Sequence, residues 1–116
     1  MAHLLLVEDE PLVSVIAEEW LLDLGHVVVR PAADLASALA LAEGPIDAAI
    51  VDVSLGRGSG YPLAEVLAAR GVPFVFATGY GPDGLEPAWR SRPTLTKPFA
   101  LDDFRRAVER LLAAGG

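Results

Sequence analysis

Asp52 is the residue of this sequence that is best placed to do chemistry. The four apolar residues before it, 48–51, predict a short strand buried on both faces, and a glycine-rich loop follows. Open α/β sheets bind ligands at the carboxyl ends of their strands, which is where this carboxylate is expected to lie. An isolated loop acid more often caps a turn. The case for a reactive carboxylate therefore depends on the residues around it.

Other polar side chains stand at the ends of three further predicted strands. Glu8 and Asp9 follow the first strand, Thr78 the fourth and Lys97 the fifth. In a parallel sheet these ends share one edge, so the side chains are expected to meet. Each has an ordinary explanation when taken singly: acids favoured by a helix dipole, a turn hydroxyl, and a lysine that reaches solvent. Coincidence at every one of these strand ends is a poor explanation.

This set of side chains suits the transfer of a phosphoryl group. Three carboxylates at one edge repel one another and raise a pKa, and a divalent cation relieves the repulsion. Oxygen ligands with room for water favour Mg²⁺ (magnesium) over zinc. Asp52 is then the expected phospho-acceptor. Lys97 and the Thr78 hydroxyl are expected to contact oxygens of the phosphoryl group.

Strands and helices alternate along the chain that must position these residues. Strands are predicted at 4–7, 27–29, 48–51, 72–77 and 94–96, and helices at 11–24, 34–42, 60–70 and 101–113. The alternation predicts an α/β fold, a doubly wound (flavodoxin-like) five-stranded parallel sheet with helices on both faces. With the strand order 2-1-3-4-5, the first and third strands adjoin at a switch point beside the acids.

The segment 81–92, where a fourth helix belongs in this alternation, is poor in helix formers. It contains two glycines and two prolines: Gly81, Pro82, Gly84 and Pro87. Interior proline costs a helix ~3 kcal/mol and glycine ~1 kcal/mol. We therefore expect this helix to be short, covering at most 86–90, or disordered.

Composition restricts the classes of function. The 116 residues suffice for one domain with a real core, and a single domain over 1–116 is expected. The absence of cysteine excludes disulfides and thiolate metal sites. A net charge of −7 argues against sequence-independent nucleic-acid binding by this domain. No apolar stretch approaches the ~20 residues of a membrane span and no basic leader opens the sequence, so a cytoplasmic location without membrane contact is expected.

From about 4 to 112 the chain resembles the receiver domains of response regulators in two-component signalling. The residues at that family's spacings are Glu8, Asp9, Asp52, Gly60, Thr78, Lys97, Pro98 and Phe99. The resemblance implies that Asp9 and Asp52 bind Mg²⁺ directly. It also implies that Glu8 helps through a water molecule and that the backbone carbonyl of Ser54 completes the protein ligands.

The same resemblance implies a signalling switch rather than an enzyme with a separate substrate. Such a domain takes its phosphoryl group from a histidine kinase or phosphotransfer protein, catalyses only its own phosphorylation and dephosphorylation, and acts on a downstream protein partner. The sequence names neither partner.

Departures from the common receiver pattern are informative. Most receivers carry an aromatic residue three positions before the lysine, where this chain has Thr94. The segment 74–80, Phe-Val-Phe-Ala-Thr-Gly-Tyr, instead resembles the FATGUY receiver subfamily, which lacks that aromatic and has a reduced, glycine-rich fourth helix. The hypothesis is that 79–92 is the mobile element that phosphorylation orders. Gly56 replaces a common proline, with an expected effect on local stability only.

Two aromatic residues outside this set have open interpretations. Tyr80 stands two residues beyond Thr78, where its ring either shields the acyl phosphate from water or packs over its own loop. Trp89, together with Leu95, is a candidate for an exposed face that binds a partner.

Two other classes of function remain as alternatives. Phosphatases of the haloacid dehalogenase type also attack phosphorus with an aspartate, but they need a second acid two residues later, where this chain has Ser54. A phosphorylation-independent docking module with a receiver fold needs no reactive side chains. The complete set of acids, hydroxyl and lysine argues against it.

Overall fold

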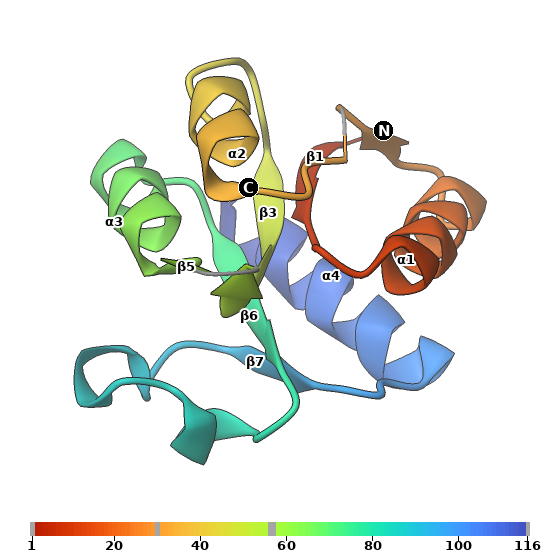
Figure 1. Ribbon diagram of the computed structural model, residues 1–116. Coiled ribbons are helices and arrows are strands. Elements are labelled where there is room, and N and C mark those ends of the chain that lie inside the picture. The colour runs from red at the N-terminus through yellow and green to blue at the C-terminus, as the bar shows by residue number, and fades with distance from the viewer. Residues whose placement is uncertain (1, 30, 56–57, 116) are drawn as a thin grey trace.

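A five-stranded parallel sheet forms the centre of the computed structural model, which describes residues 2–29, 31–55 and 58–115 (Figure 1). Its strand order is β2-β1-β3-β6-β7, and every pairing within it is parallel. The strands are β1 (His3–Val7), β2 (Val27–Val28), β3 (Ala48–Asp52), β6 (Phe74–Thr78) and β7 (Thr94–Thr96). β6 and β7 are the fourth and fifth predicted strands. Gly56 lies outside the described residues.

Among the described residues, four α-helices cover the sheet. They are α1 (Pro11–Asp23), α2 (Leu35–Leu41), α3 (Tyr61–Arg70) and α4 (Leu101–Gly115). α2 and α3 pack on one face of the sheet, whereas α1 and α4 pack on the other (Figure 1). No helix in the described part of the chain has the length and apolar character needed to cross a membrane.

Local sequence signals account for the ends of these helices. Pro11 opens α1, where its missing N–H costs no hydrogen bond. The Asp34 carboxylate caps α2 by accepting a hydrogen bond from the Ser37 backbone N–H at 2.8 Å. Gly71 ends α3 in the left-handed conformation, with φ of +72°.

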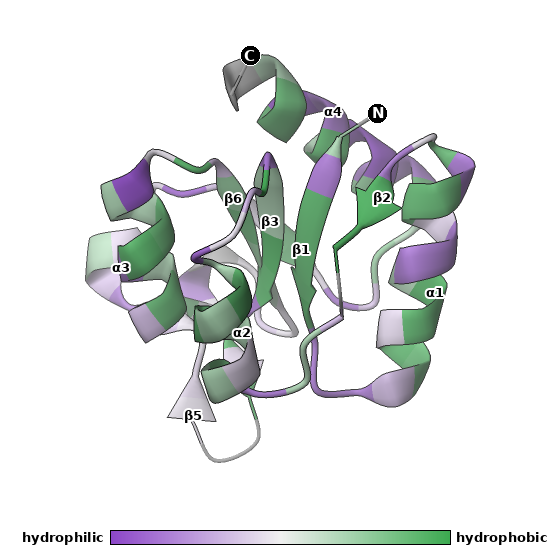
Figure 2. Cartoon of the chain, turned by 90° about the horizontal axis from the view of Figure 1, so that it is seen from above, coloured by the Kyte–Doolittle hydropathy of each residue, from purple (hydrophilic) through white to green (hydrophobic). Residues whose placement is uncertain are grey.

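The core consists of two clusters of buried side chains, one on each face of the sheet. Alternate residues of β1 supply both: Leu5 contributes to the cluster under α2 and α3, and Leu6 to the cluster under α1 and α4. Figure 2 shows β1, β3 and β6 as hydrophobic along most of their length. Such strands, buried on both faces, hold their carboxyl ends in fixed positions relative to one another.

The inner face of α1 matches the predicted one in part, through Ala17 and Trp20. The spacing of apolar residues predicts a stripe through Val13, Ile16 or Ala17, Trp20 and Leu24. In the structure the buried residues of α1 are Ala17 and Leu21, and Ile16 is 36% exposed. Because this helix is apolar on nearly every side, periodicity alone does not identify the side that faces the sheet.

The segment 79–92 forms no α-helix. Its regular structure consists of two 3₁₀ turns, η1 (Pro82–Gly84) and η2 (Pro87–Trp89). The expected reduction of the fourth helix is confirmed: the region 86–90 contains only the 3₁₀ turn η2, since the prolines break the hydrogen-bond ladder after a single turn. Leu85, between the two turns, is buried in the core.

A two-stranded antiparallel hairpin follows Asp52, where the sequence predicts only a loop. Its strands are β4 (Ser54–Leu55) and β5 (Gly58–Ser59). The hairpin leads directly to the start of α3.

Candidate functional site

Asp52 lies at the carboxyl end of β3, the central strand of the sheet, and is 3% exposed. Its Oδ1 accepts a hydrogen bond from the Ser54 backbone N–H at 3.2 Å. Its Oδ2 accepts one from the Lys97 Nζ at 3.0 Å. The neighbouring strands are β1, which precedes the acids, and β6, which ends in Thr78. The sheet therefore brings the predicted residues to one edge.

Lys97 is the cation at the centre of this edge. Its Nζ lies 2.7 Å from Glu8 Oε1, 3.0 Å from Asp52 Oδ2 and 3.8 Å from Glu10 Oε1. Its backbone N–H donates to the Thr78 carbonyl at 2.8 Å, which ties the chain after β7 to the end of β6. The lysine thus joins the acids after β1 to Asp52 at the end of β3.

Burial and charge set the ionisation of this group of side chains. Burial raises the pKa of Asp52 from 3.8 to about 7, with a further contribution from the hydrogen-bonded Glu8 carboxyl, and Lys97 opposes the rise. Burial disfavours the charged form of Lys97, but its hydrogen bonds to Glu8 and Asp52 outweigh this effect and raise the pKa of Lys97. Burial is therefore the main obstacle to ionisation of Asp52, and the Lys97 ammonium is the group that favours it.

The residues after β1 fit a hard divalent cation. Carboxylate oxygens of Glu8, Asp9 and Glu10 lie within 4.8 Å of one another. A donor set made only of oxygen suits Mg²⁺. A cleft of about 540 Å³ connects these acids with Asp52; its lining includes Asp9, Glu10, Asp52, Ser54, Thr78 and Lys97. Glu8 is 5% exposed and reaches the site through Lys97.

Two residues that sequence reasoning missed belong to the site. Glu10 is the last of three consecutive acids, but the receiver pattern includes only the first two, Glu8 and Asp9. Gly84 packs so tightly that an added Cβ would lie 3.1 Å from Thr78 Oγ1 and 2.6 Å from Tyr80 Cβ. No sequence signal marks this glycine, because the contact arises only from the fold of η1.

Thr78 is buried, and its Oγ1 accepts a hydrogen bond from the Tyr80 backbone N–H at 3.1 Å. Tyr80 is 86% exposed and lies at the cleft, so its ring does not pack over the loop. Leu95 is 4% exposed and belongs to the core, so the predicted exposed face that included it is wrong. Trp89 is half-buried and packs against the core on the opposite face of the sheet.

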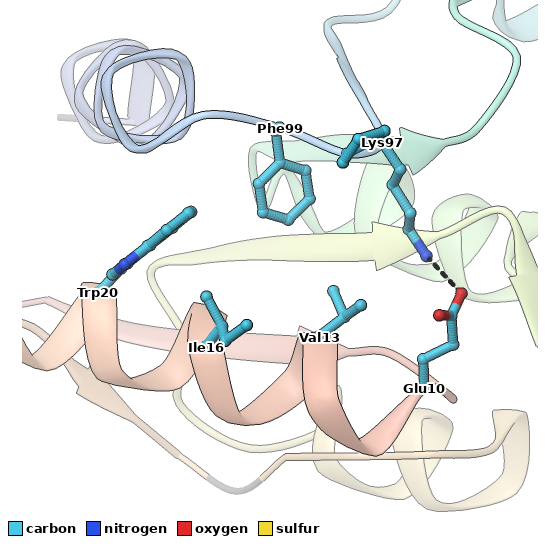
Figure 3. Close-up of a pocket in the computed structure, with 7 residues that line it drawn as sticks. Glu10, Val13, Ile16, Trp20, Lys97 and Phe99 are labelled. Carbon is cyan, nitrogen blue, oxygen red and sulfur yellow. Dashed lines mark ion pairs between the residues drawn. The ribbon is translucent and has the colours of Figure 1, made fainter.

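An apolar groove of about 380 Å³ adjoins the site. Figure 3 shows Val13, Ile16 and Trp20 of α1 pointing toward Phe99, with Glu10 and Lys97 at one end. Trp20 meets Phe99 edge-on, with ring centroids 6.0 Å apart. The groove therefore opens beside the group of acids.

Comparison with known proteins places this geometry among signalling domains. No family model matches the chain. PdtaR, a transcriptional regulatory protein of Mycobacterium tuberculosis, is 32% identical over 112 residues, which cover 92% of this chain and 55% of PdtaR. The chain thus spans about half the length of the curated relatives that it matches.

Two solved structures cover nearly the whole chain. SdrG of Sphingomonas melonis Fr1 is 44% identical, with a TM-score of 0.81, over 99% of this chain and 96% of SdrG. The receiver domain of the sensor histidine kinase PA1611 from Pseudomonas aeruginosa, solved with a magnesium ion in its active-site cleft, is 28% identical, with a TM-score of 0.82, over 97% of this chain and 98% of that domain. The sequence similarity and the sheet agree, and the chain has the receiver-domain fold of response regulators.

Proposed function

We propose that this protein is a phospho-acceptor switch in which Asp52 receives a phosphoryl group from a phosphohistidine of a histidine kinase or phosphotransfer protein. The observation that carries the proposal is the contact of Asp52 with Lys97 at 3.0 Å inside a cleft that also contains Asp9 and Thr78. A docking module needs none of these contacts.

In the proposed transfer, a carboxylate oxygen of Asp52 attacks phosphorus as the bond between phosphorus and the donor imidazole nitrogen breaks. The electron pair of that bond stays on the imidazole. Lys97 is placed to contact an oxygen of the transferred group, and the buried Thr78 hydroxyl to donate to another. Hydrolysis of the acyl phosphate returns Asp52 to its starting form.

The proposed cofactor is Mg²⁺, held directly by Asp9 and Asp52 and by the Ser54 backbone carbonyl, with Glu8 acting through water. When bound, the cation would neutralise negative charge on the oxygens of the transferred phosphoryl group. The closely spaced carboxylates of Glu8, Asp9 and Glu10 support this assignment, because a divalent cation relieves the repulsion among them. Glu10, 3.8 Å from the Lys97 ammonium, adds a carboxylate at the same end of the cleft.

The finer assignment is to the FATGUY type of receiver, with the segment 79–92 as the part that responds to phosphorylation. Support comes from the motif at 74–80, from Thr94 in place of the usual aromatic residue, and from two 3₁₀ turns in place of a helix. Beryllofluoride mimics an aspartyl phosphate, and SdrG has been solved in a BeF3-activated conformation. Amide hydrogen exchange within 79–92 is expected to change on its addition with Mg²⁺. Unchanged exchange there contradicts this role.

Intact-mass measurement after incubation with acetyl phosphate and Mg²⁺ tests the proposed function. Wild type is expected to gain the mass of one phosphoryl group, and Asp52→Ala none. Asp47→Ala is the matched control, because Asp47 is an exposed acid just before the opposite end of β3 and is expected to leave the gain intact. No gain in wild type, together with no binding of Mg²⁺, contradicts the proposal and favours the docking module.

A further inference from the structure

Aromatic side chains connect the start of α3 with the segment 79–92. Tyr61, the first residue of α3, stacks on Trp89 with ring centroids 6.2 Å apart and an interplanar angle of 20°. Its hydroxyl accepts a hydrogen bond from the Glu86 backbone N–H at 2.8 Å. Trp89 also meets Phe76 of β6 edge-on at 5.7 Å. These ring contacts, with one phenol hydroxyl, fix the segment against the fold where a helix is missing.

The other end of this connection is the backbone of the acceptor strand. Tyr61 follows Gly60, and a Cβ at Gly60 would lie 2.4 Å from the Asp52 carbonyl oxygen and 2.6 Å from Val51 Cγ1. The Gly60 N–H donates to the Val53 carbonyl at 2.9 Å. Because this contact leaves no free space, a shift of the end of β3 displaces the start of α3 as well.

We infer that Tyr61 is a positioning residue of the switch, which transmits the phosphorylation state of Asp52 to the segment 79–92 through its hydrogen bond to Glu86 and its stack on Trp89. The inference rests on the proposed function. Tyr61 contacts neither the phosphoryl group nor the cation in this scheme, so its effect is on the response and not on the transfer step. Ligand-driven coupling of this kind requires that the two ends share a physical connection, which these contacts provide.

Two backbone amides distinguish the connection through Tyr61 from an alternative connection through the Thr78 hydroxyl. The Glu86 N–H donates to the Tyr61 hydroxyl at 2.8 Å, so its exchange with solvent reports the Tyr61 connection. The Tyr80 N–H donates to Thr78 Oγ1 at 3.1 Å, so its exchange reports the connection through the Thr78 hydroxyl. Both can be followed in the same sample.

The experiment is residue-resolved amide hydrogen exchange on the whole chain, wild type and Tyr61→Phe, with Mg²⁺ in the presence and absence of beryllofluoride. Phenylalanine keeps the ring and removes the acceptor oxygen. Without beryllofluoride, the Glu86 amide of the variant should exchange about fivefold faster, as expected for the loss of one hydrogen bond. Addition of beryllofluoride should change the exchange rate of the Glu86 amide in wild type but not in Tyr61→Phe. The exchange rate of the Tyr80 amide should change in both proteins.

The control is Tyr80→Phe, the same chemical change at a ring that is 86% exposed, which should leave Glu86 exchange as in wild type. The inference is overturned if beryllofluoride changes the exchange rate of the Glu86 amide equally in wild type and in Tyr61→Phe. Phosphoryl uptake by both proteins in the mass measurement then shows that the proposed function survives. A wild type that takes up neither phosphoryl group nor beryllofluoride overturns the proposed function and this inference with it.

Discussion

At Asp52, burial and ion pairing act in opposite directions on one carboxylate. Burial raises its pKa, with Glu8 adding to the rise, and Lys97 lowers it, leaving a value of about 7. A carboxyl group in a cleft with a pKa near 7 is characteristic of a functional site. A buried carboxylate at that position does not stabilise the fold. The ionised form of Asp52, which the proposed transfer requires, therefore costs stability.

Asp52→Asn should stabilise the protein at neutral and higher pH. Because the folded-state pKa of about 7 lies above the ordinary 3.8, the folded chain binds more protons than the unfolded chain between these values, and stability falls as pH rises through that window. The variant should gain roughly 2 kcal/mol in free energy of unfolding at pH 8, a discounted figure because the cleft admits solvent. Denaturant unfolding across pH measures it, and the gain should shrink toward pH 4. A gain independent of pH contradicts this origin.

At the scale of elements, the ends of strands do most to define the site, and these could be predicted. Strand-like runs are followed or closed by Glu8, Asp52, Thr78 and Lys97, and this pattern alone predicts that the acids, the hydroxyl and the lysine lie at one edge of the sheet. The pairing of 54–55 with 58–59 could not be predicted, because strands of two residues are too short to show alternating hydrophobicity. The inner face of α1 could be predicted only in part: Ala17 and Trp20 face the core as expected, whereas Leu21 was not expected, because apolar residues surround the helix.

Gly60→Ala should be destabilising out of proportion to its size. The added methyl group would meet the Asp52 carbonyl oxygen and Val51 Cγ1 at 2.4 and 2.6 Å, so the junction of the hairpin and α3 must shift. Overpacking of this kind costs about 2 kcal/mol. Denaturant unfolding measures the loss. Gly79→Ala is the matched control, since a Cβ there meets no atom within 4 Å among the described residues. Equal effects of the two substitutions contradict the argument.

For the whole molecule, negative charge predominates. The net charge is −7, and the arginines of α4 are partly neutralised by neighbours. Arg105 pairs with Asp102 and Glu109, each at 3.3 Å, and Arg106 with Asp103 at 3.6 Å. Composition alone indicated the sign of the charge, whereas the pairing on α4 follows from its helical spacing of three and four residues.

This domain alone should therefore not bind nucleic acid without sequence preference. Its negative net charge repels the phosphate backbone of nucleic acid. On α4, Arg105 and Arg106 already pair with acids of the same helix, which makes them less available to replace the counterions of a nucleic acid. Fluorescence polarisation with a labelled duplex at low salt should show no change up to micromolar protein. Binding that weakens as salt is added contradicts this expectation.

The most direct test of the central claim locates the phosphoryl group on the chain. After incubation with acetyl phosphate and Mg²⁺, borohydride reduces an aspartyl phosphate to homoserine, which peptide mass mapping detects. The expected result is conversion at Asp52 in wild type, dependent on Mg²⁺, with Asp9 and Glu10 unchanged. A mark on another acid, with Asp52 intact, contradicts the assignment of Asp52 as the acceptor.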